Sequence, residues 1–349
     1  MTSRSRSSRS WRATRRALLG GAVLAALGLA SAGALAQTAT LKFGTFIPPK
    51  ADEIERGIAP WLDELEKESG GALKFQRFFG GTIERSLLKQ HEQLQNGLQD
   101  ATIIPVPYVF SLFPDFTVFA LPYLVESAKE GSILSWRMHQ RGLLRGMDTL
   151  HVVGTYLNDP LVLHFRNPIK SLDDVKGAKI RITSPEGVGV IKLFHGAVVG
   201  MPISEVAQSL STGVLDGTMN SWGSLRAFRI ESLIKGDVDE PLGAISFIVA
   251  INKKVYDGLP AKAKQALEKL GGEKLALRMG AVFDAQAASV KAAARKDPNR
   301  TIIGFPGAER DKRLETFKPL YDEWLKSTPE GASKMAALQK LLADIRAGR

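Results

Sequence analysis

Alternating apolar and polar residues predict short strands near the start of the chain, separated by amphipathic helices. Residues 40–45, 73–79 and 100–106 alternate as half-buried strands do. Apolar residues recur with helical spacing over 54–68, and this helix is expected to end at Ser69-Gly70-Gly71. The strand–helix–strand order predicts a parallel sheet with right-handed crossovers.

The pattern continues through the rest of the chain. Strands are expected at residues 150–155, 161–166, 179–182, 245–252 and 301–305. A long helical region is expected from 261 to about 296, and a terminal helix follows the last strand. Ser204 is expected to be the N-cap of a helix, and Ser171 should cap a short helical turn.

The stretch 177–222 carries the candidate binding chemistry. It opens with Lys179-Ile180-Arg181-Ile182, in which basic and apolar residues alternate, and it ends with Asn220 and Trp222. Arg181 and Asn220 therefore flank one strand–helix unit, where they could converge on an anionic ligand. Only arginine offers a planar fork of donors that matches a carboxylate.

This stretch resembles the solute-binding proteins of tripartite ATP-independent periplasmic (TRAP) transporters, of the DctP type. The family motifs G-x-K-[IL]-R, P-x-S-E-V and T-G-V-x-D-G appear at residues 177–181, 202–206 and 212–217, followed by Asn220. The resemblance implies that Arg181 grips a substrate carboxylate. It also implies that Asn220 contacts the ligand.

The resemblance further implies an α/β fold, the two-lobed periplasmic binding protein fold, with hinged parallel or mixed sheets and a long helix that spans both lobes. Residues 1–36 are expected to be an export signal. Lobe I would comprise residues 37–158 and 246–286, and lobe II residues 159–245 and 287–349. The ligand would lie between the lobes.

Composition and charge exclude several classes of protein. The chain of 349 residues has no cysteine, which excludes disulfides and thiolate chemistry, and its five histidines lack zinc-site spacing. Six of its arginines precede an apolar run that starts at Ala17, as in an export signal. Arg15-Arg16 resembles a twin-arginine signal, although the general secretory route stays open. Removal of residues 1–36 lowers the formal charge from +11 to +5, so nucleic-acid binding is not expected.

Five further residues are candidates for the ligand site. Trp222 has the shape to form the floor of an apolar pocket, although it could equally be a core residue. His164 is more simply explained as a core or surface histidine, and its alternative role is to donate a hydrogen bond in the pocket. Tyr156 begins the first expected crossing between lobes. Ile203 replaces an aromatic residue that many members of the family carry before S-E-V, and Phe46 follows the first strand, where sialate binders have polar residues.

These features together predict a periplasmic solute-binding protein of a TRAP transporter. Because polar groups are scarce at the expected site, we expect an apolar or aromatic monocarboxylate as the ligand. The expected partners are this ligand and the membrane subunits, with no cofactor, metal or catalytic residue, and the protein is expected to be monomeric. A secreted enzyme or a module that serves a separate sensor remains the alternative, and turnover of a bound carboxylate would favour the enzyme.

Overall fold

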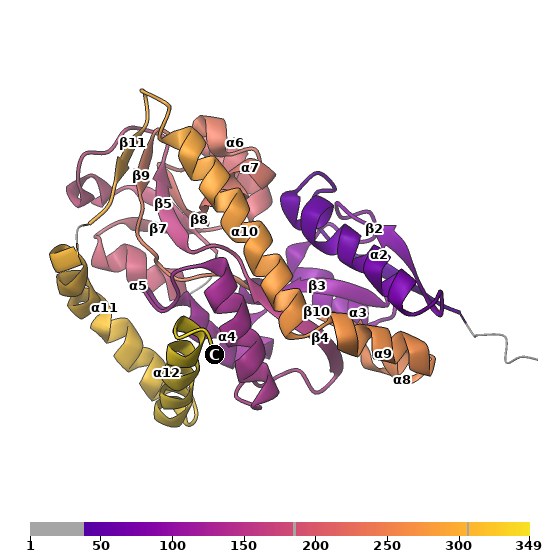
Figure 1. The fold of residues 1–349 in the computed structure, drawn as a ribbon. Helices are drawn as coiled ribbons and strands as arrows, with labels where there is room; N and C mark the ends of the chain where they lie inside the picture. Colours follow the sequence, from indigo (N-terminus) through magenta and orange to yellow (C-terminus); the bar gives the residue numbers. More distant parts are fainter. Residues whose placement is uncertain (1–37, 184–185, 306) are drawn as a thin grey trace, which may run out of the picture. The chain divides into compact units, whose positions relative to one another are not determined.

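The computed structural model describes residues 38–183, 186–305 and 307–349, and the expected export signal lies outside these ranges. Residues Ala39–Arg349 form one compact unit, in which the described chain builds two mixed β-sheets (Figure 1). We call the first sheet with its covering elements lobe I and the second sheet with its covering elements lobe II. Within the described ranges, no helix combines the length and the apolar character needed to cross a membrane.

The sheet of lobe I has the strand order β2-β1-β3-β10-β4. β1 pairs in parallel with β2 and β3, as the strand–helix–strand order predicted, whereas β10 is antiparallel to β3 and β4. The strands are β1 (Ala39–Gly44), β2 (Leu73–Phe78), β3 (Ala101–Pro105), β4 (Leu150–Leu157) and β10 (Ser246–Asn252). The covering elements are η1 (Glu53–Ile58), α2 (Ala59–Glu68), η2 (Leu87–Lys89), α3 (Gln90–Gln95), η3 (Val106–Tyr108), η4 (Phe110–Leu112), η5 (Pro114–Ala120), α4 (Ala128–Gln140), α8 (Lys253–Asp257) and α9 (Ala261–Leu270).

The helix expected over residues 54–68 is divided between a π-helical first part, η1, and the α-helix α2. It ends where the sequence indicated, because Gly70 and Gly71 adopt positive φ values of 62° and 80°. Their N–H groups donate to the carbonyls of Lys67 and Glu66, which satisfies the last turn of the helix.

The sheet of lobe II has the order β11-β9-β5-β8-β6-β7 and mixes parallel and antiparallel pairs. The strands are β5 (Leu161–Phe165), β6 (Lys179–Ile182), β7 (Ala197–Gly200), β8 (Gly217–Ser221), β9 (Gly236–Val238) and β11 (Thr301–Ile303). The covering elements are η6 (Leu172–Val175), α5 (Glu186–Leu193), η7 (Ile203–Glu205), α6 (Val206–Ser211), α7 (Trp222–Ala227) and η8 (Glu231–Leu233).

Two capping predictions have different outcomes. Ser171 caps η6 in a reciprocal capping box with Asp174, as predicted. The prediction that Ser204 is an N-cap is wrong, because Ser204 lies inside the 3₁₀ turn η7 and α6 follows with Glu205 at its N-cap. The preceding Pro202 fixes an extended backbone, and the turn starts directly after it at Ile203, three residues before α6 begins.

Two of the connections between the lobes, β4 to β5 and β9 to β10, lie side by side. Asn158, between β4 and β5, donates its backbone N–H to the carbonyl of Ile245 at 3.1 Å, and its side-chain oxygen accepts from the Ile245 N–H at 2.8 Å. Leu161 donates to the carbonyl of Gly243 and accepts from the N–H of Leu242. The two connections are therefore joined at the place where a hinge is expected.

The predicted helical region from 261 to about 296 is two helices, not one. α9 ends at Gly271-Gly272, and Gly272 has a φ of 61° that breaks the helical path before α10 (Glu273–Ala294). α10 nevertheless spans both lobes, as expected. Its N-terminal half contributes Met279 to the core of lobe I, and its C-terminal half contributes Val290 to that of lobe II (Figure 1).

The C-terminal segment consists of α11 (Gly307–Ser327) and α12 (Gly331–Arg346), where a single helix was expected. α11 packs against α5 of lobe II, whereas α12 packs against α4 of lobe I (Figure 1). We expected residues 287–349 in lobe II, and β11 lies in the sheet of that lobe. The position of α12 favours lobe I for that helix, and the exact lobe boundaries stay a proposal.

Candidate functional site

Arg181 lies on β6 and is fully buried in the sheet of lobe II. Its Nε donates to the carbonyl of Met201 at 3.0 Å, and its Nη1 donates to Thr183 Oγ1 and Asn220 Oδ1, each at 2.8 Å. In the part of the chain that the structure describes, it forms no ion pair. Burial lowers the pKa of this guanidinium, yet arginine stays charged at physiological pH. The site therefore holds a buried positive charge without an anionic partner among the described residues.

Asn220 lies on β8 beside Arg181, so the structure brings together the two residues that flank the strand–helix unit. Its Oδ1 accepts from Arg181, which leaves the amide group as a donor. The Asn220 Nδ2 atom is buried and has no hydrogen-bond partner among the described residues. A buried polar group without a partner costs about 1–3 kcal/mol, which an acceptor on a ligand would remove.

Tyr108 comes from η3 of lobe I and reaches the same place. Its hydroxyl oxygen accepts from Arg181 Nη2 at 3.0 Å and from the backbone N–H of Ile203 at 3.3 Å. One oxygen is thus held by a guanidinium and a backbone N–H, which is the arrangement that a carboxylate oxygen prefers. The sequence analysis did not select Tyr108, because it follows Pro105-Val106-Pro107, a segment with no polar side chain.

A cavity of about 50 Å³ lies between the lobes, next to Tyr108 and Ile203. Its wall is mainly apolar and includes two predicted residues, Phe46 and Ile203. The other apolar members are Ala51, Leu87, Pro105, Ala227, Phe228, Ile245, Phe247 and Phe283. The polar members are Glu53, Tyr108, Asn158, Ser221, Ser224 and Gln286. Arg181 contacts Tyr108 but is not itself part of the cavity wall.

Tyr156 does not line the cavity but contacts three residues that do, Phe247, Phe283 and Glu53. Its ring stacks on Phe247 at 4.9 Å and on Phe283 at 5.9 Å between centroids, and the rings of Phe247 and Phe283 are nearly parallel at 12°. Its hydroxyl donates to Glu53, which lines the cavity at the start of η1. Burial raises the pKa of Glu53 to about 7. Glu53 was not selected from the sequence, where it is one acid among several in an amphipathic helix.

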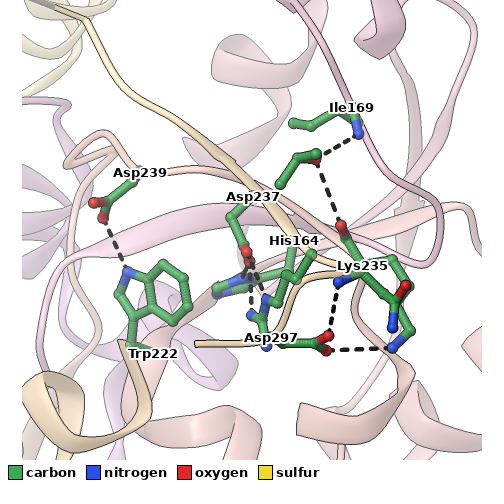
Figure 2. Close-up of polar contacts among 10 residues, drawn as sticks. His164, Ile169, Trp222, Lys235, Asp237, Asp239 and Asp297 are labelled. Carbon is green, nitrogen blue, oxygen red and sulfur yellow. Dashed lines mark hydrogen bonds and ion pairs between the residues drawn. The ribbon is translucent and has the colours of Figure 1, made fainter. Parts of the chain in front are cut away.

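His164 and Trp222 occupy a different place in lobe II. His164 Nδ1 lies 2.6 Å from Asp237, whose carboxylate also accepts two hydrogen bonds from Arg300 at 2.7 and 2.8 Å. Trp222 contacts His164 edge-on, and its indole N–H donates to Asp239 at 3.0 Å (Figure 2). Burial alone would raise the pKa of Asp237, but the hydrogen bonds from Arg300 and His164 hold it below its ordinary value. Neither His164 nor Trp222 lines the cavity beside Tyr108.

Two other hollows fit an anion less well. The larger, of about 650 Å³, has Arg145 and the exposed Lys192 in its wall, and Arg145 is already paired with Asp115 at 2.6 Å. The other, of about 390 Å³, is lined by Trp222 and by several acids, which include Asp159. Within residues 38–183, 186–305 and 307–349, no three histidine, aspartate or glutamate side chains are grouped to hold a metal ion.

Comparison with known proteins identifies a family of solute-binding proteins. Residues 43–328 match the DctP family, described as bacterial extracellular solute-binding protein, family 7. A solute-binding protein of Albidiferax ferrireducens is 30% identical over 74% of this chain and 79% of its own length. The C4-dicarboxylate-binding periplasmic protein DctP of Rhodobacter capsulatus is 28% identical over 95% of this chain and 99% of its own length.

A crystal structure of similar fold is that of a TRAP solute-binding protein from Rhodoferax ferrireducens in complex with copurified benzoate. It has a TM-score of 0.81 and 25% sequence identity, and the match covers 88% of this chain and 98% of that one. A marine metagenome TRAP protein with bound 3-hydroxybenzoate also has a TM-score of 0.81, at 24% identity and with 88% and 99% of the two chains covered. These likenesses confirm the two-lobed α/β fold.

Proposed function

The chain belongs to family 7 of the bacterial extracellular solute-binding proteins, the DctP family, and on that premise we propose that it captures an aromatic monocarboxylate between its lobes, with Arg181 as the carboxylate anchor. One observation carries the proposal: Arg181 is 0% exposed and has no acidic partner among the described residues. An isolated buried charge is costly, so a site that keeps one is expected to pair it with an opposite charge in use.

We expect the ligand carboxylate to bind where the Tyr108 hydroxyl now accepts two hydrogen bonds. The donors there are Arg181 Nη2 and the Ile203 N–H, and the unpartnered amide of Asn220 is adjacent to the guanidinium. Three donors and one positive charge would satisfy a carboxylate, while a neutral ligand would leave the guanidinium uncompensated.

The body of the ligand is expected to be flat and apolar. Phe247 and Phe283 present nearly parallel rings to the cavity, and Phe46 and Ile203 add apolar surface. Among the similar proteins, one is named for C4-dicarboxylates and another holds benzoate, so likeness alone does not decide the ligand. The described cavity wall contains a carboxyl group, Glu53, and no cation that could pair with a second carboxylate, and this favours a monocarboxylate.

Proteins of this family are periplasmic solute-binding transport proteins, and TRAP members work with membrane subunits. We propose that this chain acts as a monomer and that residues 1–36 direct its export. The exported protein should begin at or near Gln37 by N-terminal sequencing. Replacement of Arg15-Arg16 by two lysines should block export if the route is twin-arginine and leave it unchanged if the route is general secretory.

A thermal-shift screen of carboxylic acids on the exported protein tests the proposed function. A ligand at 100 times its dissociation constant adds about 2.7 kcal/mol to stability, which raises the melting temperature by several degrees. We expect benzoate-like acids to give this shift without being turned over. If no monocarboxylate shifts the melting temperature, or if a bound acid is converted to a product, the proposal is wrong.

A further inference from the structure

The cavity has one feature that anchoring a carboxylate does not require, namely the carboxyl group of Glu53. This side chain comes from lobe I, whereas Arg181 comes from lobe II. Glu53 has no ion pair among the described residues, and the hydrogen bond recorded for it there is the one from Tyr156. A buried acid without a cation destabilises the fold, so its presence in a cavity wall points to a role in binding.

We propose that Glu53, oriented by Tyr156, accepts a hydrogen bond from a hydroxyl group on the ring of the bound acid, so that the ligand is a hydroxylated aromatic monocarboxylate. The inference rests on the proposed function and names its substrate class more closely. Tyr156 occupies one carboxylate oxygen of Glu53, and a carboxylate can accept further hydrogen bonds. A phenolic hydroxyl is a strong donor. Above the Glu53 pKa of about 7 the acceptor is ionised, and a hydrogen bond to an ionised acceptor is stronger than one to a neutral acceptor.

The charges of the site set the orientation of such a ligand. Its carboxylate is attracted to Arg181 and repelled by Glu53, so the carboxylate end faces lobe II and the hydroxyl end faces lobe I. The nearly parallel rings of Phe247 and Phe283 would contact its aromatic body between these two ends. A second carboxylate in place of the hydroxyl would meet Glu53 as a like charge, so the same residue should reject aromatic dicarboxylates.

The rigid support of Glu53 agrees with a role in specificity. The Tyr156 ring is fully buried and stacks between elements of lobe I and α10, so its hydroxyl has a fixed position. A site with a fixed acceptor rejects an analogue without the donor, because the acceptor is then left buried without a partner. Benzoate should therefore bind more weakly than a hydroxybenzoate of the right geometry.

Calorimetry on the exported protein with benzoate, 3-hydroxybenzoate, 4-hydroxybenzoate and isophthalate tests the inference. We expect one hydroxybenzoate to bind at least tenfold more tightly than benzoate, and isophthalate at least tenfold more weakly. In Glu53→Gln this preference for the hydroxyl should fall to threefold or less. Tyr156→Phe, which keeps the acid but removes its orienting donor, should reduce the preference in part.

Glu240→Gln is the matched control, because Glu240 is also a buried glutamate that accepts from a tyrosine, Tyr123, at 2.8 Å, but it lines a different hollow. This variant should keep the full hydroxyl preference. If wild type does not distinguish benzoate from either hydroxybenzoate, or if Glu53→Gln and Tyr156→Phe both keep the preference, the inference is overturned while the proposed function stands. If none of the acids binds, the proposed function is wrong and the inference with it.

Discussion

Replacement of Arg181 by methionine should separate the binding function of this residue from its effect on stability. Methionine fills much of the volume of the arginine stem but has no charge and no N–H donor. The four hydrogen bonds to Met201, Thr183, Asn220 and Tyr108 are lost together with the positive charge. Ligand affinity and unfolding free energy should respond to these losses very differently.

The loss of affinity should be large. The ligand carboxylate would be buried without its compensating charge, and removal of one partner from a buried charge pair costs about 3–5 kcal/mol. At 1.4 kcal/mol per factor of ten, affinity should fall roughly a hundred- to several thousand-fold. Arg181→Lys should recover only part of this, because an ammonium cannot reproduce the bidentate fork.

The unliganded protein should keep its stability to within about 1 kcal/mol. The variant loses hydrogen bonds of about 1 kcal/mol each, but it also removes a fully buried charge that has no acidic partner among the described residues, and these terms offset each other. Arg300→Met is the matched control. Arg300 is also buried, but its loss strips Asp237 of two charge-assisted hydrogen bonds, so that variant should lose about 3–5 kcal/mol of unfolding free energy.

Isothermal calorimetry with the best ligand of the thermal-shift screen and urea unfolding without ligand measure the two quantities. Circular dichroism establishes that each variant is folded. The reasoning is refuted if Arg181→Met binds within tenfold of wild type, since the clamp would then lie elsewhere. It also fails if Arg181→Met loses as much stability as Arg300→Met, because Arg181 would then be a structural residue.

Three further predictions concern pH, a core indole and a close helix contact. Burial raises the pKa of Glu53 and of Asp159 to about 7 each, from 4.5 and 3.8. The folded state keeps protons that the unfolded state releases, so the unfolding free energy should fall as pH rises from about 5 to 8. Measured by urea unfolding at several pH values, this fall should be smaller for Glu53→Gln and Asp159→Asn. A pH dependence equal to that of wild type would contradict the assignment. Trp222→Phe removes the donor to Asp239 and should lower the unfolding free energy by about 1 kcal/mol. Calorimetry should find ligand affinity within threefold of wild type, and a tenfold loss of affinity would instead place Trp222 in the site. In Gly280→Ala the new Cβ would lie 2.5 Å from the Lys129 Cα, so differential scanning calorimetry should show that the unfolding free energy falls by about 1–3 kcal/mol. Gly200→Ala is the control and should show no such loss, because no atom of another part of the chain lies within 4 Å of its new Cβ.

The sequence by itself determined most elements and one half of the candidate site. Strand periodicity placed β1, β2, β3 and β6 within a residue or so of their observed bounds. β1 and β2 alternate between more and less buried positions, whereas β3 is buried on both sides. The match to the family motif G-x-K-[IL]-R singled out Arg181, a charged residue in a strand with apolar neighbours. Asn220 followed from the motif spacing, and the structure shows its oxygen 2.8 Å from Arg181 Nη1.

Short strands and helix breaks were less predictable. β7 and β9, of four and three residues, carry too few positions to show a period. The break between α9 and α10 was missed because the apolar pattern continues through Gly271-Gly272, and only the positive φ of Gly272 reveals that the path turns. Ser204 was assigned as a cap from residue type alone, whereas Pro202 decided where the turn begins.

Only the tertiary structure decided which residues share the cavity. Tyr108 and Arg181 are 73 residues apart, and Glu53 and Tyr156 are 103 apart, so no local pattern relates them. His164 and Trp222 were candidates from the sequence, but pairing with Asp237 and Asp239 directs them into the interior of lobe II. A periodic pattern records how each element buries its own face, whereas a site between two lobes is built by the approach of faces whose partners the local sequence does not specify.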